Sequence, residues 1–201
     1  MSLSLNNREA AYAIEPLFLA RWSPRAFAPE SIPEHELMTI FEAARWAPSS
    51  FNAQPWRFIY AHRDTPGWPT IFDLLAPMNQ AWAGRAAALV VVVSATTAIP
   101  PGATAPMPSY SHSFDAGAAW AYLALQATKI GWHTHGIVGF DIEKAYEVLK
   151  IPTGYRVEAA LAVGRQGDKN LLPPILQSRE QPNGRKPLEE LVMKDRFSAQ
   201  P

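Results

Sequence analysis

The sequence predicts one domain in which helices and strands alternate around a buried central strand. Its 201 residues, 48% of them hydrophobic, can bury a substantial core but leave little room for a second independent domain. Val90–Val93 are four consecutive β-branched residues, a pattern typical of a strand that is buried on both faces. Segments before and after this strand carry apolar residues at helical spacing. We therefore expect a sheet that is covered on both faces at its centre.

Composition excludes several functions. Eighteen basic and eighteen acidic residues cancel, so no overall field favours nucleic acid or an anionic membrane, and any anion site must be local. Without cysteine there are no disulfides, thiolate metal sites or iron–sulfur clusters, and a redox reaction would need an organic cofactor. The N-terminus lacks a signal-peptide pattern, and no apolar run approaches the ~20 residues of a membrane span. We expect a soluble cytoplasmic protein.

Two helices are expected before the first strand. Asn6 or Asn7 would cap the first, which would end near Arg21 because Pro24 cannot continue it. Its apolar face would comprise Ala10, Ala13, Ile14, Leu17 and Phe18. Ser31 and Glu34 have the spacing of a capping box for the second helix. The buried stripe of that helix would comprise Leu37, Ile40, Phe41, Ala44 and Ala47.

Between these helices, the segment RWSPRAF at 21–27 places two guanidinium groups and a hydroxyl within five residues. Forked donors suit a phosphate or a carboxylate, and Ser23 could add a hydrogen bond. The alternative interpretation is a pair of solvated arginines at a helix end, where they would interact only with the helix dipole.

A polar loop follows the second helix. The segment RWAPSSFNAQPWRFIY at 45–60 ends a helix at Pro48, crosses Ser49, Ser50, Asn52 and Gln54, and becomes a strand after Pro55. Hydroxyls and carboxamides can hold a ligand by donating and accepting. A plain connection, in which these side chains satisfy local backbone groups, is the alternative.

The middle of the chain supplies a rim, a loop and a long helix. A short helix is expected around 71–75, and Asn79 and Gln80 precede the valine strand at its rim. Residues 98–113 form a proline-rich loop that is too long for a simple connection and is typical of a lid. The helix expected at 114–130 is apolar nearly all round, so a second copy of the chain is a natural way to cover it.

The segment WHTHGIVGFD at 132–141 predicts a strand, a glycine-containing turn and a helix capped by Asp141. Gly136 and Gly139 let backbone approach a ligand closely. His133 and His135 share one face of that strand, but a third ligand is not obvious, so we favour half-buried hydrogen-bond donors over a metal pair. A strand at 157–163 completes the compact part, and 165–201 is expected to be an extended arm carrying Arg185 and Lys186.

Elimination narrows the chemistry. No serine lies in a Gly-x-Ser-x-Gly elbow, and neither Gly-x-Gly-x-x-Gly nor a P-loop motif follows a strand. What remains is a local cationic site, a set of amides and hydroxyls, and a close-approach glycine turn. These groups match a phosphate joined through a polar chain to a flat ring, and FMN fits that description.

The motifs resemble, in order and along nearly the whole chain, those of the FMN-dependent nitroreductase family. They are RWSPRAF at 21–27, APSSFNAQPWRF at 47–58, the NQAWA segment, HGIVGFD at 135–141 and GRKPLEELV at 184–192. The resemblance implies an α+β fold, a three-layer α/β/α sandwich with a mostly antiparallel central sheet. It also implies one domain over 1–201, whose arm at 165–201 is exchanged in a homodimer with FMN at the subunit interface.

The resemblance also implies roles for particular residues. Arg21, Trp22 and Ser23 would hold the phosphate and ribityl end, Arg25 the pyrimidine edge, and Arg185 with Lys186 would close on the phosphate. Pro48, Ser49 and Ser50 would come from the partner subunit, with Asn52 beside them. Gln80, where relatives often have Asn, would meet the ring edge, and Val138 and Gly139 would offer backbone donors near N5. Relatives often have a glutamate at the Val138 position; little loss is expected, because that contact is a backbone one.

The implied activity is an oxidoreductase that uses NAD(P)H and works by ping-pong hydride transfer through flavin N5, with no side chain required as a catalytic acid or base. Nitroaromatics, quinones and conjugated carbonyls are all suitable small-molecule acceptors. Met107, Tyr110 and His112 of the long loop are the candidate acceptor-binding residues. The alternatives are a protein that binds, senses or stores FMN without turnover, and a relative that fragments flavin or removes halogens.

Overall fold

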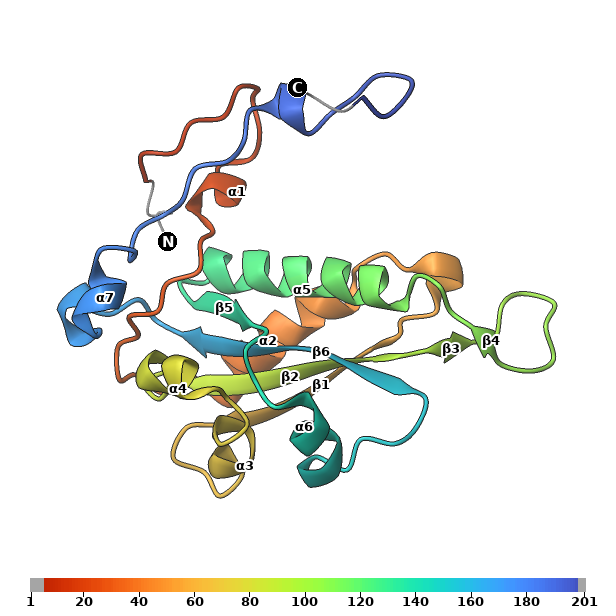
Figure 1. Cartoon of the computed structure of the whole chain (residues 1–201), viewed down its shortest axis with the longest axis horizontal. Coiled ribbons are helices and arrows are strands. Elements are labelled where there is room, and N and C mark those ends of the chain that lie inside the picture. The colour runs from red at the N-terminus through yellow and green to blue at the C-terminus, as the bar shows by residue number, and fades with distance from the viewer. Residues whose placement is uncertain (1–5, 199–201) are drawn as a thin grey trace.

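A four-stranded antiparallel sheet with strand order β1-β2-β6-β5 organises the chain, and helices cover both of its faces (Figure 1). The computed structural model describes residues 6–198. The strands are β1 Trp56–His62, β2 Ala88–Ala95, β5 His133–Ile137 and β6 Tyr155–Gly164, with a small hairpin of β3 Thr97–Ala98 and β4 Met107–Pro108. The helices are α1 Pro16–Ala20, α2 Glu34–Arg45, α3 Trp68–Phe72, α4 Pro77–Ala83, α5 His112–Lys129, α6 Ile142–Val148 and α7 Pro174–Gln177. Short 3-10 turns lie at Ser50–Asn52, Lys169–Leu171 and Leu188–Glu190.

Strand β2 lies at the centre of the sheet, as the valine run predicts. Val91 pairs with Ile59 of β1 on one side and with Ala160 of β6 on the other. Successive side chains of a strand point to opposite faces, so Val90 and Val92 pack into one core while Val91 and Val93 pack into the other. The α+β prediction with a mostly antiparallel sheet is therefore confirmed.

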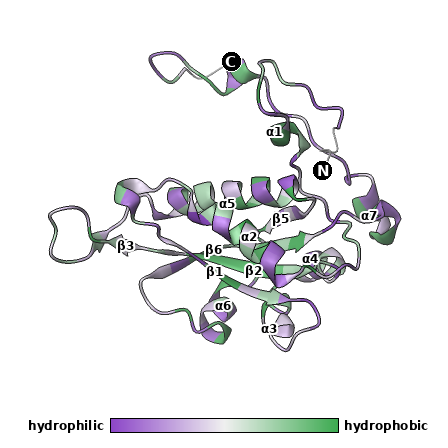
Figure 2. Cartoon of the chain, turned by 180° about the vertical axis from the view of Figure 1, so that it is seen from behind, coloured by the Kyte–Doolittle hydropathy of each residue, from purple (hydrophilic) through white to green (hydrophobic). Residues whose placement is uncertain are grey.

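The two cores define three layers. Helices α2 and α5 cover one face of the sheet, and α3, α4 and α6 lie on the other (Figure 1). Figure 2 shows β1 and β2 coloured as hydrophobic between helices that are polar on their outer sides. The stripe predicted for α2 is confirmed at Leu37, Ile40 and Ala44, which are fully buried against α5 and the sheet. Burial of each of the two larger side chains, Leu37 and Ile40, contributes about 1.5–3 kcal/mol, and burial of an alanine methyl contributes less.

The first helix is shorter than the sequence predicts. Only Pro16–Ala20 is helical, and neither Asn6 nor Asn7 is an N-cap. Proline has no backbone N–H and suits the first turn of a helix, so Pro16 begins α1 instead of continuing an earlier one. The Asn6 side chain donates to the Leu19 carbonyl at 2.8 Å, which folds the preceding segment back along α1.

The predicted capping box is also wrong. Helix α2 begins at Glu34 with Pro33 as its N-cap, and no side chain caps it. The Glu34 carboxylate accepts hydrogen bonds from Tyr60 and His62 of β1, at 2.7 Å each, and so anchors the helix to the sheet edge. The short helix expected at 71–75 begins earlier, at Trp68, because Pro69 fits its first turn.

Helix α5 has one covered face and one open face. Ala116, Ala119 and Leu123 are buried against α2 and the sheet, whereas Phe114 on the opposite side is 82% exposed. Gly131 ends the helix, as predicted, with a φ of 86°. Within the described part of the chain, no helix is long and apolar enough to cross a membrane.

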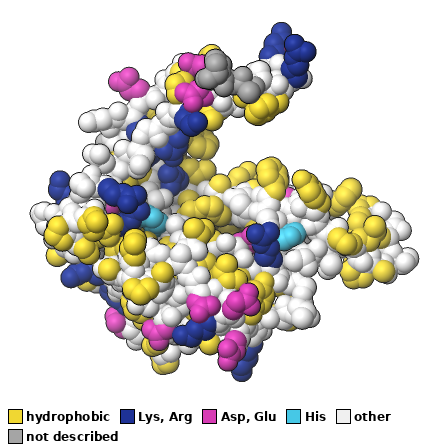
Figure 3. All heavy atoms as spheres, in the orientation of Figure 1, with side chains coloured by type: hydrophobic (Ala, Val, Ile, Leu, Met, Phe, Trp, Pro, Cys, Tyr) yellow, Lys and Arg dark blue, Asp and Glu magenta, His cyan; other side chains and the backbone are white. Residues whose placement is uncertain are grey.

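The two terminal segments leave the body together. Residues after Glu180 run beside the segment before α1, and the two rise away from the sheet in Figure 1. They enclose an open hollow of about 940 Å³. Figure 3 shows a notch between these segments and the body, with basic side chains gathered along its inner side.

Candidate functional site

Three predicted site residues converge on one pocket. Arg21, Ser23 and Arg185 line an open cavity of about 600 Å³, which also has Trp120 of α5 and Gly136 of β5 in its wall. Pro24 ends regular structure just after α1, so the chain turns here and presents both Arg21 and Ser23 to the cavity. Arg21 Nη1 donates to Ser23 Oγ at 3.1 Å. The hydroxyl is thus held beside the cation.

The arginines at this pocket have no acidic partner. Burial, and then the charges of Arg8 and Arg185, lower the pKa of Arg21. Among residues 6–198, no carboxylate forms an ion pair with any of these three guanidinium groups. Like charges gathered without a counter-charge repel one another and favour a bound anion. The arrangement suits a phosphate group, for which guanidinium forks have matching geometry.

Arg25 has different surroundings. Its Cζ lies 6.0 Å from the centre of the Trp82 ring, and the His135 ring lies 4.6 Å from the same tryptophan. The backbone of this segment is held by Glu180, whose carboxylate accepts from the N–H groups of Arg25 and Ala26, each at 2.8 Å. Glu180 also marks the point where the tail leaves the body, so it ties the tail to the arginine segment.

His133 and His135 of β5 contact the arginine segment, through Trp22 and Pro24 respectively. Burial lowers the pKa of each to about 4, and the neighbouring Arg21 adds to this effect at His133. His135 Nδ1 donates to the Pro24 carbonyl at 3.0 Å, whereas His133 Nδ1 is buried with no hydrogen-bond partner. The expected half-buried hydrogen-bond donor is therefore His135. In the described part of the chain, no group of three or more His, Asp or Glu side chains could hold a metal.

The turn after β5 is held by hydrogen bonds from α4 and the residue before it. The Gly139 carbonyl accepts from Asn79 Nδ2 at 2.8 Å and from the Ala76 N–H at 3.0 Å. A Cβ on Gly139 would lie 2.8 Å from the same Asn79 nitrogen, so a larger residue here would displace the Asn79 side chain. Within residues 6–198 the N–H groups of Val138 and Gly139 have no hydrogen-bond partner, and the Val138 side chain is 81% exposed. The turn therefore offers free backbone donors.

Asn79 and Gln80 point in different directions from α4. The Gln80 amide donates to the Phe72 carbonyl at 3.3 Å and so turns toward α3. It is Asn79 that contacts the glycine turn, and Asn79 Oδ1 accepts from Trp82 Nε1 at 3.3 Å. Adjacent residues of a helix point about 100° apart, so only one of the two amides can face the turn.

The Pro48–Asn52 loop lies elsewhere. It sits at the N-terminal end of α5, where the Ser50 N–H donates to the buried Asp115 carboxylate at 3.2 Å. Phe51, Asn52 and Gln54 all have positive φ values of 48–54°, a strained conformation that is often found at functional sites. None of the loop residues lines the arginine pocket of the same chain.

The long loop at 98–113 is a hairpin that projects from the body (Figure 1). Met107 and Tyr110 are exposed. His112 is not: its Nδ1 lies 2.7 Å from Ser94 Oγ, and Ser94 and Ser113 both donate to the Glu158 carboxylate. This network anchors the base of the loop to β2 and β6.

The two remaining predicted residues have local partners. Trp22 is buried and meets the His133 ring edge-on, with ring centres 6.3 Å apart. Lys186 forms an exposed ion pair with Glu190 at 3.4 Å, a contact of small energetic value. Arg185 donates only to carbonyls of its own turn, so its charge remains available.

Several residues of the site escape sequence reasoning. Asp115 carries a detectable signal, since it is the one acidic residue in the predicted apolar helix. Asn79 carries the same carboxamide signal as its neighbour Gln80. Arg8 and Glu180 carry no local signal, because their partners are 13 and 154 or 155 residues away in sequence.

The chain is similar to known proteins in both sequence and structure. A family model described as the nitroreductase family matches residues 19–66, which include both the arginine segment and the polar loop. A crystal structure of an oxidoreductase containing FMN is 46% identical, covers 100% of each chain and superposes with a TM-score of 0.93. A nitroreductase family protein from Streptococcus pneumoniae is 22% identical, with a TM-score of 0.70 over 89% of this chain and 98% of that chain.

Two curated relatives add to these matches. An NADH dehydrogenase from Thermus thermophilus is 27% identical over 202 residues, covering 87% of this chain and 92% of that protein. The nitroreductase NfnB from Mycolicibacterium smegmatis is 44% identical over 48 residues. That second match is local, since it spans 24% of this chain and 20% of the relative.

Proposed function

Because this chain belongs to the nitroreductase family, we propose that it is an FMN-dependent oxidoreductase that uses NAD(P)H to reduce electron-poor small molecules. The observation that carries the proposal is the uncompensated arginine cluster, together with a turn that has free backbone donors and begins two residues after Gly136 of the pocket wall. A ligand that matches this site has an anionic group at one end, for the arginines, and a flat group that accepts hydrogen bonds at the other, for the backbone N–H groups.

The residues fit FMN by their chemistry. Arg21, Ser23 and Arg185 would hold the phosphate, since they combine forked cations with a hydroxyl at one pocket. The N–H groups of Val138 and Gly139 would meet the ring edge, and Asn79 keeps that turn in place. Arg25, braced by Glu180, would supply a cation near the ring.

When bound, FMN would supply the hydride chemistry between NAD(P)H and the acceptor. The protein's part would be to orient the ring, to exclude water from one face and to place a positive charge near it. No side chain of this chain is assigned as a general acid or base. Nitroaromatics, quinones and conjugated carbonyls are the proposed acceptors, and the exposed Met107 and Tyr110, with His112 anchoring their loop, are the proposed determinants of choice among them.

The proposed assembly is a homodimer built from one domain. Of the arm expected at 165–201, the part before Glu180 packs on its own body through Leu172 and Leu176, so the part after Glu180 is proposed to contact the partner. Two observations support the dimer: the apolar face of α5 is open, and the Pro48–Asn52 loop lies away from the arginine pocket of its own chain. In a dimer, that loop and its partner's pocket could complete one site.

One experiment tests the function. The purified protein should be yellow, and heating should release FMN and not FAD or riboflavin. Steady oxidation of NADH or NADPH should then require an added quinone or nitroaromatic. Bound FMN without turnover would instead indicate a flavin-storage or sensing protein, and a colourless protein that takes up no FMN would reject the proposal.

A further inference from the structure

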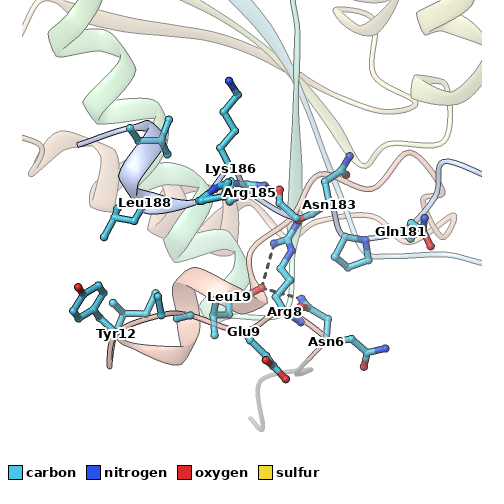
Figure 4. Close-up of a pocket in the computed structure, with 18 residues that line it drawn as sticks. Asn6, Arg8, Glu9, Tyr12, Leu19, Gln181, Asn183, Arg185, Lys186 and Leu188 are labelled. Carbon is cyan, nitrogen blue, oxygen red and sulfur yellow. Dashed lines mark hydrogen bonds between the residues drawn. The ribbon is translucent and has the colours of Figure 1, made fainter. Parts of the chain in front are cut away.

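Arg8 stands outside every motif that suggests the function, yet it lies at the arginine cluster. Its Nη1 donates to the Arg21 carbonyl at 2.8 Å and to the Leu19 carbonyl at 3.2 Å. Figure 4 shows the side chain extending from the N-terminal segment toward Arg185 and Asn183 of the tail. Arg8 therefore lies between the two chain segments that carry the predicted phosphate ligands.

The charge of Arg8 is not neutralised. It forms no ion pair with any residue of the described chain, and Glu9, its neighbour, points away from the guanidinium in Figure 4. Its Nε is buried without a hydrogen-bond partner. The charge of Arg185 acts on both Arg8 and Arg21, so the three cations share one region.

Another arginine that braces the backbone, Arg63, has a carboxylate nearby: it donates to the carbonyls of Pro29 and Arg85 and lies 3.3 Å from Asp64. Arg8 makes the same kind of backbone contacts, but its neighbours are two more cations. Gathering like charges costs free energy, and a bound anion offsets that cost.

We propose that Arg8 is a positioning residue of the phosphate subsite: it fixes the backbone of Arg21 and adds a third positive charge for a phosphate monoester. This inference rests on the proposed function, which supplies the phosphate as that of FMN. A second source of the same chemistry is the 2′-phosphate of NADPH, and the experiment separates the two. The N-terminal segment thereby becomes part of the cofactor site.

The test compares FMN with riboflavin, which lacks the phosphate. Full-length wild type and Arg8→Lys, Arg8→Gln and Arg8→Glu variants are titrated with both flavins by fluorescence quenching at low salt. FMN affinity should decrease in the order wild type, Lys, Gln, Glu, with a loss of about fivefold or more for Gln, while riboflavin affinity changes by less than about twofold. Arg63→Gln is the matched control and should leave both affinities unchanged.

Other outcomes overturn the inference in distinct ways. Equal losses for FMN and riboflavin, or equal losses in the Gln and Glu variants, would show that Arg8 only maintains structure. Oxidation rates of NADPH and NADH by the same variants are measured in parallel; unchanged FMN affinity with a lowered preference for NADPH over NADH would assign Arg8 to the donor's phosphate instead. If wild type binds no FMN at all, the proposed function fails before Arg8 is tested.

Discussion

Arg21 and Arg25 lie four residues apart in sequence, but the structure gives them different surroundings. Arg21 lines the pocket with Ser23 and Arg185, whereas Arg25 lies over Trp82 and its backbone is held by Glu180. Two similar cations in one motif are therefore expected to act on different parts of a bound flavin.

The first prediction separates these two roles. Arg21→Ala removes a charge-assisted phosphate contact worth about 1.5–3 kcal/mol, so FMN affinity should fall about ten- to a hundredfold. Arg25→Ala should weaken binding and also make the flavin potential more negative, because a cation beside the ring stabilises added negative charge. Spectroelectrochemical titration of both variants measures this. Equal potentials in wild type and Arg25→Ala would remove Arg25 from the ring edge.

The second prediction concerns acid stability. The pKa of His133 is lowered to about 4 in the folded protein, whereas a histidine in an unfolded chain titrates near 6.5. Its stabilising contribution is therefore complete above about pH 6.5 and is lost as the pH falls toward 4, because the unfolded state binds the proton first. His135 acts in the same direction.

Thermal unfolding between pH 7 and pH 5 checks this. The Tm of the wild type should fall as the pH is lowered. The Tm of His133→Phe should fall less, because phenylalanine keeps a ring against Trp22 and cannot take up a proton. At pH 5, protonation linked to one such histidine lowers the free energy of unfolding by about 2 kcal/mol. His35→Gln, on the exposed side of α2, is the control. An identical pH dependence in wild type and His133→Phe would contradict the assignment.

Among the elements, helix α5 has an exposed apolar face that the rest of the chain leaves uncovered. Its buried face packs on α2 and the sheet, but its other face exposes Phe114, Gly117, Ala121 and Tyr122. Small residues on that face allow another helix to approach closely. The open face is the part of the fold that one chain leaves unfinished.

The third prediction follows from this face. Ala121 is exposed in the single chain, so Ala121→Glu should be tolerated by the fold but should bury a charge in a dimer and dissociate it. Light scattering should show a dimer for wild type and monomers for the variant, with FMN lost on dissociation. Thr39→Glu, at an exposed site on α2, should stay dimeric. A wild type that is monomeric and retains flavin would reject the interface.

The fourth prediction concerns the hairpin loop. Met107 and Tyr110 are exposed on it, and the Ser94, His112 and Glu158 network holds its base. Replacing residues 107–110 by a Gly/Ser linker should leave FMN content intact and change the ratio of quinone to nitroaromatic rates by more than about tenfold, or roughly 1.4 kcal/mol. FMN lost in proportion to activity, with unchanged rate ratios, would assign the loop a structural role.

At the scale of the whole molecule, the C-terminal tail is linked to the arginine segment at two places. Glu180 fixes the start of the tail to the backbone of Arg25 and Ala26, and Arg185 brings the tail's charge to the pocket. Between Glu180 and Ser198, where the described part of the tail ends, no residue is buried in either hydrophobic cluster, so this stretch has no core of its own.

The fifth prediction concerns removal of the tail after Glu180. A chain that ends after Glu180 keeps the body's contacts, so its sheet should remain folded by circular dichroism, while FMN binding and dimer stability should both decrease. The full-length double variant Arg185→Gln/Lys186→Gln is the matched comparison, and it should lose FMN affinity but keep the dimer. Full retention of FMN by the truncated chain would exclude the tail from the site.

The sequence by itself determined the elements that have a strong local pattern. Four consecutive valines predict a central strand, and the apolar spacing of α2 predicts a helix with the buried face that the structure shows. For α5 the sequence predicted a helix, but only the structure showed which face the chain itself covers. The residues expected at the site came from the sequence too, because Arg, Ser and Gly were identified by their own chemistry at short spacing. Where local rules competed, the sequence misled: Pro16 and Pro33 each start a helix where capping residues suggested another boundary.

Only the tertiary structure decided which of these groups meet. It placed Arg8 beside Arg21, turned Asn79 and not Gln80 toward Gly139, and set Glu180 under the arginine segment. It also separated the Pro48–Asn52 loop from the arginine pocket of the same chain. The physical reason is that charges and hydrogen bonds depend on distance in space, and these partners are brought together by the packing of α5, the sheet and the two terminal segments, which no local pattern encodes.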